Sequence, residues 1–138
     1  MMAHTMLLRR TLMAITVGSG SAWLGGRRER VRAMSGSEAL AAVCAGLSCT
    51  PAIGEACLQA LPGAPSKESL EGLILADTAS LDRTFASARA FTQVIRARSR
   101  KDFRNGRIAV VGGWMLSLTE TRLYALAALA SSKRVTSG

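Results

Sequence analysis

Two consecutive glycines, Gly112 and Gly113, place the strongest constraint on how this chain folds. They separate two short runs of β-prone residues, 107–111 and 114–117, in a sequence whose other periodic segments have helical spacing. Glycine adopts positive φ angles at little steric cost, so a Gly-Gly pair suits the centre of a tight hairpin turn. We therefore expect a β-hairpin over about residues 107–118, and because an isolated hairpin is marginally stable, we expect it to pack on helices.

The residues after this hairpin predict a helix with a defined start. Ser117 and Glu120 have the spacing of a capping box, in which the serine hydroxyl and the glutamate carboxylate each accept a hydrogen bond from the other residue's backbone N–H. Apolar residues then recur at helical spacing: Leu123, Leu126, Ala127 and Ala130. The last helix is thus expected to begin at Ser117.

The preceding residues predict the other helices of a mainly α-helical domain. Pro51 follows Thr50 as a first helical residue would follow an N-cap, a second helix starts at Ser66 or Ser69, and a third starts at Leu81. One face of the third helix would carry the apolar residues Leu81, Phe85, Ala88, Phe91 and Ile95. The sequence therefore divides into a leader (1–34), a weakly structured tether or short helix (35–50), a helical domain with a hairpin (51–131) and a frayed tail (132–138).

The leader has the anatomy of an export signal. Its basic start ends at Arg9-Arg10, and the apolar stretch 11–26 has 16 residues with Gly and Ser in its middle. A membrane-spanning helix needs roughly 20 mostly apolar residues, so a secretory signal fits better. The arginine pair partly matches a twin-arginine signal, although Leu8 precedes it where Ser or Thr is usual. We expect export to the periplasm or a membrane-associated location, with an uncleaved anchor, or a true start at Met6, as the alternatives.

Positive charge is concentrated in the leader. The chain has a net charge of +9, but from Ser35 onward it has 12 basic and 8 acidic residues. The main basic run comprises Arg96, Arg98, Arg100, Lys101, Arg104 and Arg107. Its spacing suggests charges spread around a helix end, where cations are favoured by the helix dipole. A solvated helix end is the preferred interpretation, and contact of Arg100, Lys101 and Arg104 with an acidic protein or an anionic membrane is the alternative; nucleic acid is disfavoured, since export would separate the protein from it.

The sequence offers little catalytic chemistry. The one histidine, His4, lies in the leader, so no imidazole remains in the mature chain for a triad, a general base or a zinc site. Haem-attachment, phosphate-loop and dinucleotide-binding motifs are absent from the sequence. We therefore predict a non-enzymatic protein without catalytic, cofactor-binding or metal-binding residues.

Three cysteines and one tryptophan each allow two interpretations. In an oxidising compartment Cys49 and Cys57 would form a disulfide and leave Cys44 reduced or available to a partner, but a cysteine on an apolar stripe, such as Cys57, also serves as a small core residue. Trp114, beside the hairpin turn, would either cover a small core, which we favour, or anchor a partner protein.

Residues 52–130 resemble a family of small bacterial proteins known chiefly by their twin-arginine signals. The resemblance rests on Gly-Trp-x-Leu-Ser-x-Thr-Glu-x-Arg-Leu at 113–123, preceded by Ile-Arg-x5-Asp-Phe-x2-Gly-Arg at 95–107 and, further upstream, by Ile53–Pro62. This family has no established activity, so the resemblance implies export and a fold but no catalytic residues. Gly112 stands where family members commonly have an acidic residue.

Two classes of function follow from these observations. The first is an accessory subunit of an exported or membrane-associated complex, for instance with a cofactor-bearing oxidoreductase, because folded-state export suits proteins that assemble before they cross the membrane. The second is a free periplasmic or membrane-surface binding module that acts through the basic helix end. In both, the export machinery is a partner and the leader provides membrane contact.

Export through the twin-arginine route predicts a simple outcome. Replacing Arg9 and Arg10 by lysine should retain a fusion reporter in the cytoplasm, because that route reads the arginine pair. The measurement is the distribution of the reporter between periplasmic and cytoplasmic fractions. Unchanged export of the double variant would exclude the twin-arginine route.

Overall fold

The fold is mainly helical, as predicted, with the predicted hairpin before the last helix. A computed structural model describes residues 32–47, 51–78 and 83–135, which contain five helices and two short two-stranded sheets. The helices are α1 (Gly36–Gly46), α2 (Pro51–Ala60), α3 (Lys67–Thr78), α4 (Ala88–Arg104) and α5 (Leu118–Val135). Among these described residues, no helix combines the length and apolarity needed to span a membrane.

The hairpin consists of β3 (Ile108–Val111) and β4 (Trp114–Ser117). The strands are antiparallel, with Val111 paired to Trp114 and Ile108 paired to Ser117. Gly112 and Gly113 have φ angles of 56° and 82°, so both central turn residues are left-handed. This is the turn for which a Gly-Gly pair is favoured, because a Cβ atom at either position would be strained.

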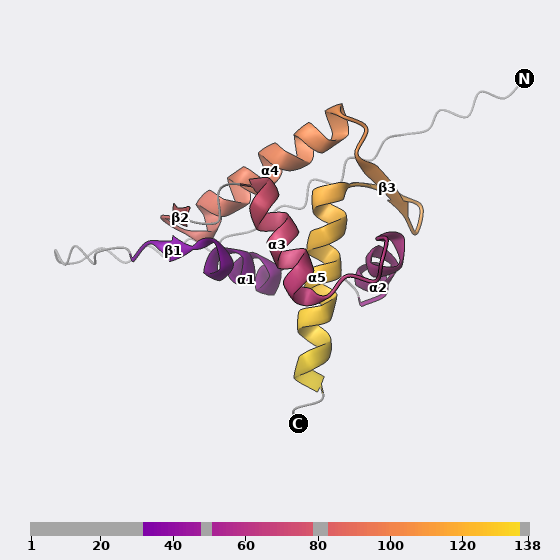
Figure 1. The fold of residues 1–138 in the computed structure, drawn as a ribbon, viewed down its shortest axis with the longest axis horizontal. Helices are drawn as coiled ribbons and strands as arrows, with labels where there is room; N and C mark the ends of the chain where they lie inside the picture. Colours follow the sequence, from indigo (N-terminus) through magenta and orange to yellow (C-terminus); the bar gives the residue numbers. More distant parts are fainter. Residues whose placement is uncertain (1–31, 48–50, 79–82, 136–138) are drawn as a thin grey trace, which may run out of the picture.

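Helix α5 is the centre of the fold and packs against each of the other four helices. Figure 1 shows α5 with α2 and the hairpin on one side and α1 and α3 on the other. The contact with α2 depends on Gly54, because a Cβ atom there would lie 2.5 Å from the Cβ of Ala128. Ala125 and Leu126 are buried where α5 faces the other helices. The small residues Gly54 and Ala128 therefore allow α2 and α5 to approach closely.

The region expected to be a tether or a short helix contains α1. Ser35 and Glu38 form a capping box, in which the Glu38 N–H donates to Ser35 Oγ (3.2 Å) and the Ser35 N–H donates to Glu38 Oε2 (2.8 Å). Ala39 and Leu40 are buried in the core. Capping and burial together explain why an Ala- and Gly-rich segment of low amphipathicity forms a helix here.

The prediction that the third helix starts near Leu81 is wrong for the residues that the structure describes. Helix α4 begins at Ala88, after Ser87, whose hydroxyl accepts a hydrogen bond from the Ala90 N–H (3.2 Å). Thr84–Phe85 instead form β2, which pairs with β1 (Met34–Ser35). Phe85 is still buried, with its ring 4.8 Å from that of Phe91 in an edge-to-face contact. Its apolar side chain fits the core from a strand as well as it would from a helix.

Candidate functional site

Asp102, in the last turn of α4, is a buried carboxylate that joins α4 to the start of α5. Its side chain is 1% exposed. Oδ2 accepts hydrogen bonds from the backbone N–H of Thr119 (2.9 Å) and from the Thr119 hydroxyl (2.6 Å). Two donors from one residue of the first turn of α5 therefore hold the carboxylate, which also lies at the positive end of that helix dipole.

Three arginines extend this contact into a charged network between α3, α4 and α5. Arg107 Nη2 lies 2.7 Å from Asp102 Oδ1, and Arg98 Nε lies 3.5 Å from the same oxygen. Arg98 also contacts Asp77 (3.4 Å), whose other oxygen is 2.6 Å from Arg122 Nη1. Among the described residues, Asp102 Oδ1 accepts no hydrogen bond, so its contacts with Arg98 and Arg107 are ion pairs only. Two carboxylates thus balance most of the positive charge of three guanidinium groups.

The pKa of Asp102 is lowered by this environment. Burial, the largest single effect, raises the pKa, but the two hydrogen bonds from Thr119 and the charges of Arg107 and Arg98 outweigh it together. The carboxylate therefore stays ionised at neutral pH. An ionised group whose partners are all structural side chains cannot serve as a general acid, so we interpret it as the anchor of the fold rather than as a reactive group.

Ser117 is a second polar anchor at the base of the hairpin. Glu120 N–H donates to Ser117 Oγ (3.1 Å) and Ser117 N–H donates to Glu120 Oε2 (2.8 Å), so both hydrogen bonds of the expected capping box are present. The buried Ser99 hydroxyl of α4 donates to Ser117 Oγ (2.9 Å). Ser117 therefore links the hairpin to α4 as well as capping α5.

The tip of the hairpin carries exposed apolar side chains. Val110 is 69% exposed and Met115 is 58% exposed, and these two residues are paired across the strands. The interpretation that Trp114 covers the core is wrong, because this residue is 55% exposed. Burial along β4 increases from Trp114 to Ser117, whereas on β3 Val111 beside the turn is 5% exposed and Ile108 at the base is 42% exposed.

The basic residues of the predicted run separate into two groups. Arg98 and Arg107 belong to the network around Asp102, whereas Arg96, Arg100, Lys101 and Arg104 are exposed on α4. The alternative role in partner contact therefore concerns only the exposed group. The sequence had no local signal for this division, because it depends on which arginines face Asp102.

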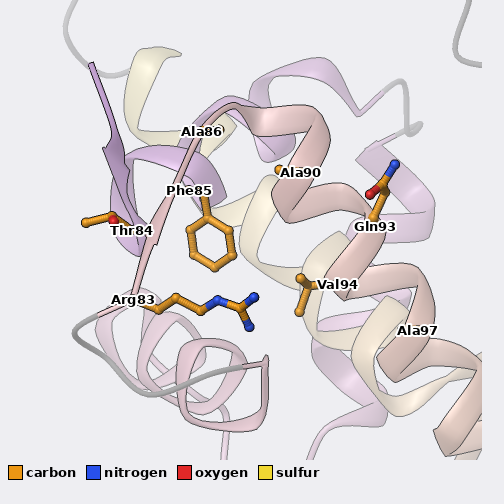
Figure 2. Close-up of a pocket in the computed structure, with 8 residues that line it drawn as sticks. All are labelled: Arg83, Thr84, Phe85, Ala86, Ala90, Gln93, Val94 and Ala97. Carbon is orange, nitrogen blue, oxygen red and sulfur yellow. The ribbon is translucent and has the colours of Figure 1, made fainter. Parts of the chain in front are cut away.

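An open depression of about 450 Å³ lies between β2 and α4 (Figure 2). Phe85, Val94 and three alanines give it an apolar lining, and its polar residues are Arg83, Thr84 and Gln93. The Arg83 guanidinium lies 5.5 Å from the centre of the Phe85 ring. Arg83 is the one ionisable residue of this lining, so the depression offers no acid–base pair.

The remaining predicted residues add no reactive cluster. Cys57 is buried on α2 and Cys44 is half-buried on α1, whereas Cys49 lies outside the described residues, as do Arg9 and Arg10 of the leader. No group of three or more His, Cys, Asp or Glu side chains suited to a metal ion occurs in the described part of the chain.

No protein-family model, curated protein or solved structure matches this chain.

Substitution of Asp102 tests the role of the network. Asp102→Asn should lower the free energy of unfolding by about 1.5–3 kcal/mol, because it removes the charge partner of Arg107, leaves Arg98 only its contact with Asp77, and weakens the hydrogen bonds from Thr119. Denaturant unfolding followed by circular dichroism measures this loss. Glu120→Gln, which keeps a capping acceptor while also removing a carboxylate, is the matched control and should change stability by less than about 1 kcal/mol. Equal stability of Asp102→Asn and the parent would contradict the anchoring role.

The pH dependence of stability provides a second test. The pKa of Asp102 is lower in the folded than in the unfolded chain. The contribution of Asp102 to the free energy of unfolding is therefore fully present at pH values well above its unfolded-state pKa of about 3.9. That contribution is lost as the pH falls from about 5 toward the folded-state pKa. Unfolding free energies measured across this range should fall more steeply for the parent than for Asp102→Asn. Parallel curves for the two proteins would show that Asp102 does not supply this acid sensitivity.

Proposed function

We propose that this protein is a non-catalytic accessory subunit that binds a partner protein of an exported complex through the exposed apolar tip of its hairpin. The tip comprises Val110, Trp114 and Met115. The observation that carries the proposal is the exposure of the cross-strand pair Val110 and Met115, which share one face of the hairpin, with Trp114 exposed on the opposite face. Neighbouring exposed apolar side chains such as this pair mark interaction sites more often than scattered single residues do.

The tip is held on a fixed base. Leu118 N–H donates to the Arg107 carbonyl (2.9 Å), which closes the hairpin where it joins α5. Ser117 is fixed by Ser99 on α4, and Arg107 by Asp102. A surface that is ordered before binding loses less conformational entropy on association, so the tip is suited to specific docking.

A protein is the kind of partner that this surface favours. A projecting hairpin fits into a groove on another surface, and Trp and other large apolar side chains supply most of the binding free energy in such contacts. The expected leader with Arg9-Arg10 supports assembly with an exported partner, for which a cofactor-bearing oxidoreductase remains the suggested class.

A double substitution at the tip tests this function. Val110→Ser with Met115→Ser should weaken binding to the partner at least tenfold, because hot-spot side chains typically contribute more than 1 kcal/mol each. The partner is first identified by mass spectrometry after purification of the tagged chain from its native host, and confirmed when the tagged partner recovers this chain. Titration calorimetry with the isolated partner then gives the affinity of each variant.

Leu73→Ser is the matched control, because Leu73 is also a large exposed apolar residue but lies on α3. It should bind as the parent does. Equal partner affinity for the tip variant and the parent would reject the hairpin as the docking surface. A parent that light scattering shows to be a dimer, broken by the tip substitutions, would instead assign the surface to a second copy of the chain and reject the proposal.

A further inference from the structure

Four arginines form one exposed stripe along α4. They are Arg89, Arg96, Arg100 and Arg104, spaced by seven, four and four residues. At about 100° per residue they fall within an arc of about 80°, and the stripe is about 22 Å long. The opposite face holds the buried residues Phe91, Ile95 and Asp102. The expectation that the basic run is merely spread around the helix end therefore misses its main feature.

The charge of this stripe is not neutralised by neighbouring side chains. Within the described ranges, none of the four arginines forms an ion pair, whereas Arg98 on the inner face contacts two carboxylates. Helix α4 contains six basic residues and one acidic residue, and that acidic residue, Asp102, points into the core. The charged side chains on the outer face of α4 are thus all cationic, and this face is complementary to an anionic surface.

Apolar surface accompanies the stripe on the same side of the helix. Phe103 is 44% exposed and lies within about 60° of Arg96 and Arg100 on the helical projection. On the helical projection Gln93 falls between Arg100 and Arg104, and Ala97 falls just beyond Arg104; both line the depression of Figure 2, whose lining is mainly apolar. Cationic and apolar side chains therefore lie beside one another on the exposed face of α4.

We propose that this face of α4 lies on a membrane surface that contains anionic phospholipids. Guanidinium groups bind phosphate oxygens in pairs of hydrogen bonds, and a helix with basic and aromatic groups on one face suits the headgroup region. A nucleic-acid duplex would also attract the arginines, but its stacked bases offer no apolar surface to the exposed Phe103 ring or to the apolar lining of the depression. The stripe is distinct from the hairpin tip, so this inference does not rest on the proposed function.

Partitioning onto vesicles tests the inference with the full-length chain. The test variant is Arg96→Gln with Arg100→Gln, and the matched control is Arg32→Gln with Lys67→Gln, which removes two positive charges from other elements. Each arginine near an anionic surface contributes about fivefold, so the test variant should bind vesicles of phosphatidylglycerol and phosphatidylcholine about 25-fold more weakly than the parent. The control should stay within about threefold of the parent.

Further measurements with the same variants decide the result. All variants share the same leader, so the ratio of partition coefficients isolates the stripe, and circular dichroism melting checks that the exposed substitutions leave the fold intact. On pure phosphatidylcholine vesicles the difference between parent and test variant should disappear. Equal losses in the test and control variants would overturn the inference in favour of net charge alone. A loss seen with duplex DNA or with an acidic protein but not with anionic vesicles would overturn it in favour of that partner.

Discussion

The buried carboxylate of Asp102 is the interaction on which the arrangement of the C-terminal half depends. It lies at the end of α4, contacts Arg107 just before β3, and accepts both donors of Thr119 at the start of α5. A charge in the core is costly unless it is paired and hydrogen-bonded, so these partners must be in place for the fold to be stable. The hairpin is therefore fixed by the groups at its two ends rather than by its own short ladder.

Local signals in the sequence were sufficient for the elements whose cause is local. The Gly-Gly turn and the pairing of Ser117 with Glu120 depend on residues within three or four positions, and the structure contains both. The start of α4 was misplaced because Phe85 satisfies a helical stripe by spacing alone. Its actual strand depends on pairing with Met34, about fifty residues earlier, which no local pattern predicts.

The candidate surfaces were predicted less well, for a related reason. Asp102, Arg107 and Thr119 all stand in the motif on which the family resemblance rests, yet no spacing rule shows that they meet. Trp114 was assigned to the core because large aromatic residues usually are buried. The structure leaves it exposed although its cross-strand partner Val111 is buried, so neither distance from the turn nor strand face alone decides burial in this hairpin.

The network also explains why net charge is a poor guide to binding in this chain. Arg98 and Arg107 contribute to the basic composition, but Asp102 and Asp77 hold them in ion pairs, where they are part of the fold. Arg122 is held in the same way. Among the residues that the structure describes, the outward arginines of α4 form no ion pair. One helix therefore separates its cations by face: the inner ones join α3 and α5 to α4, and the outer ones remain available to an anionic surface.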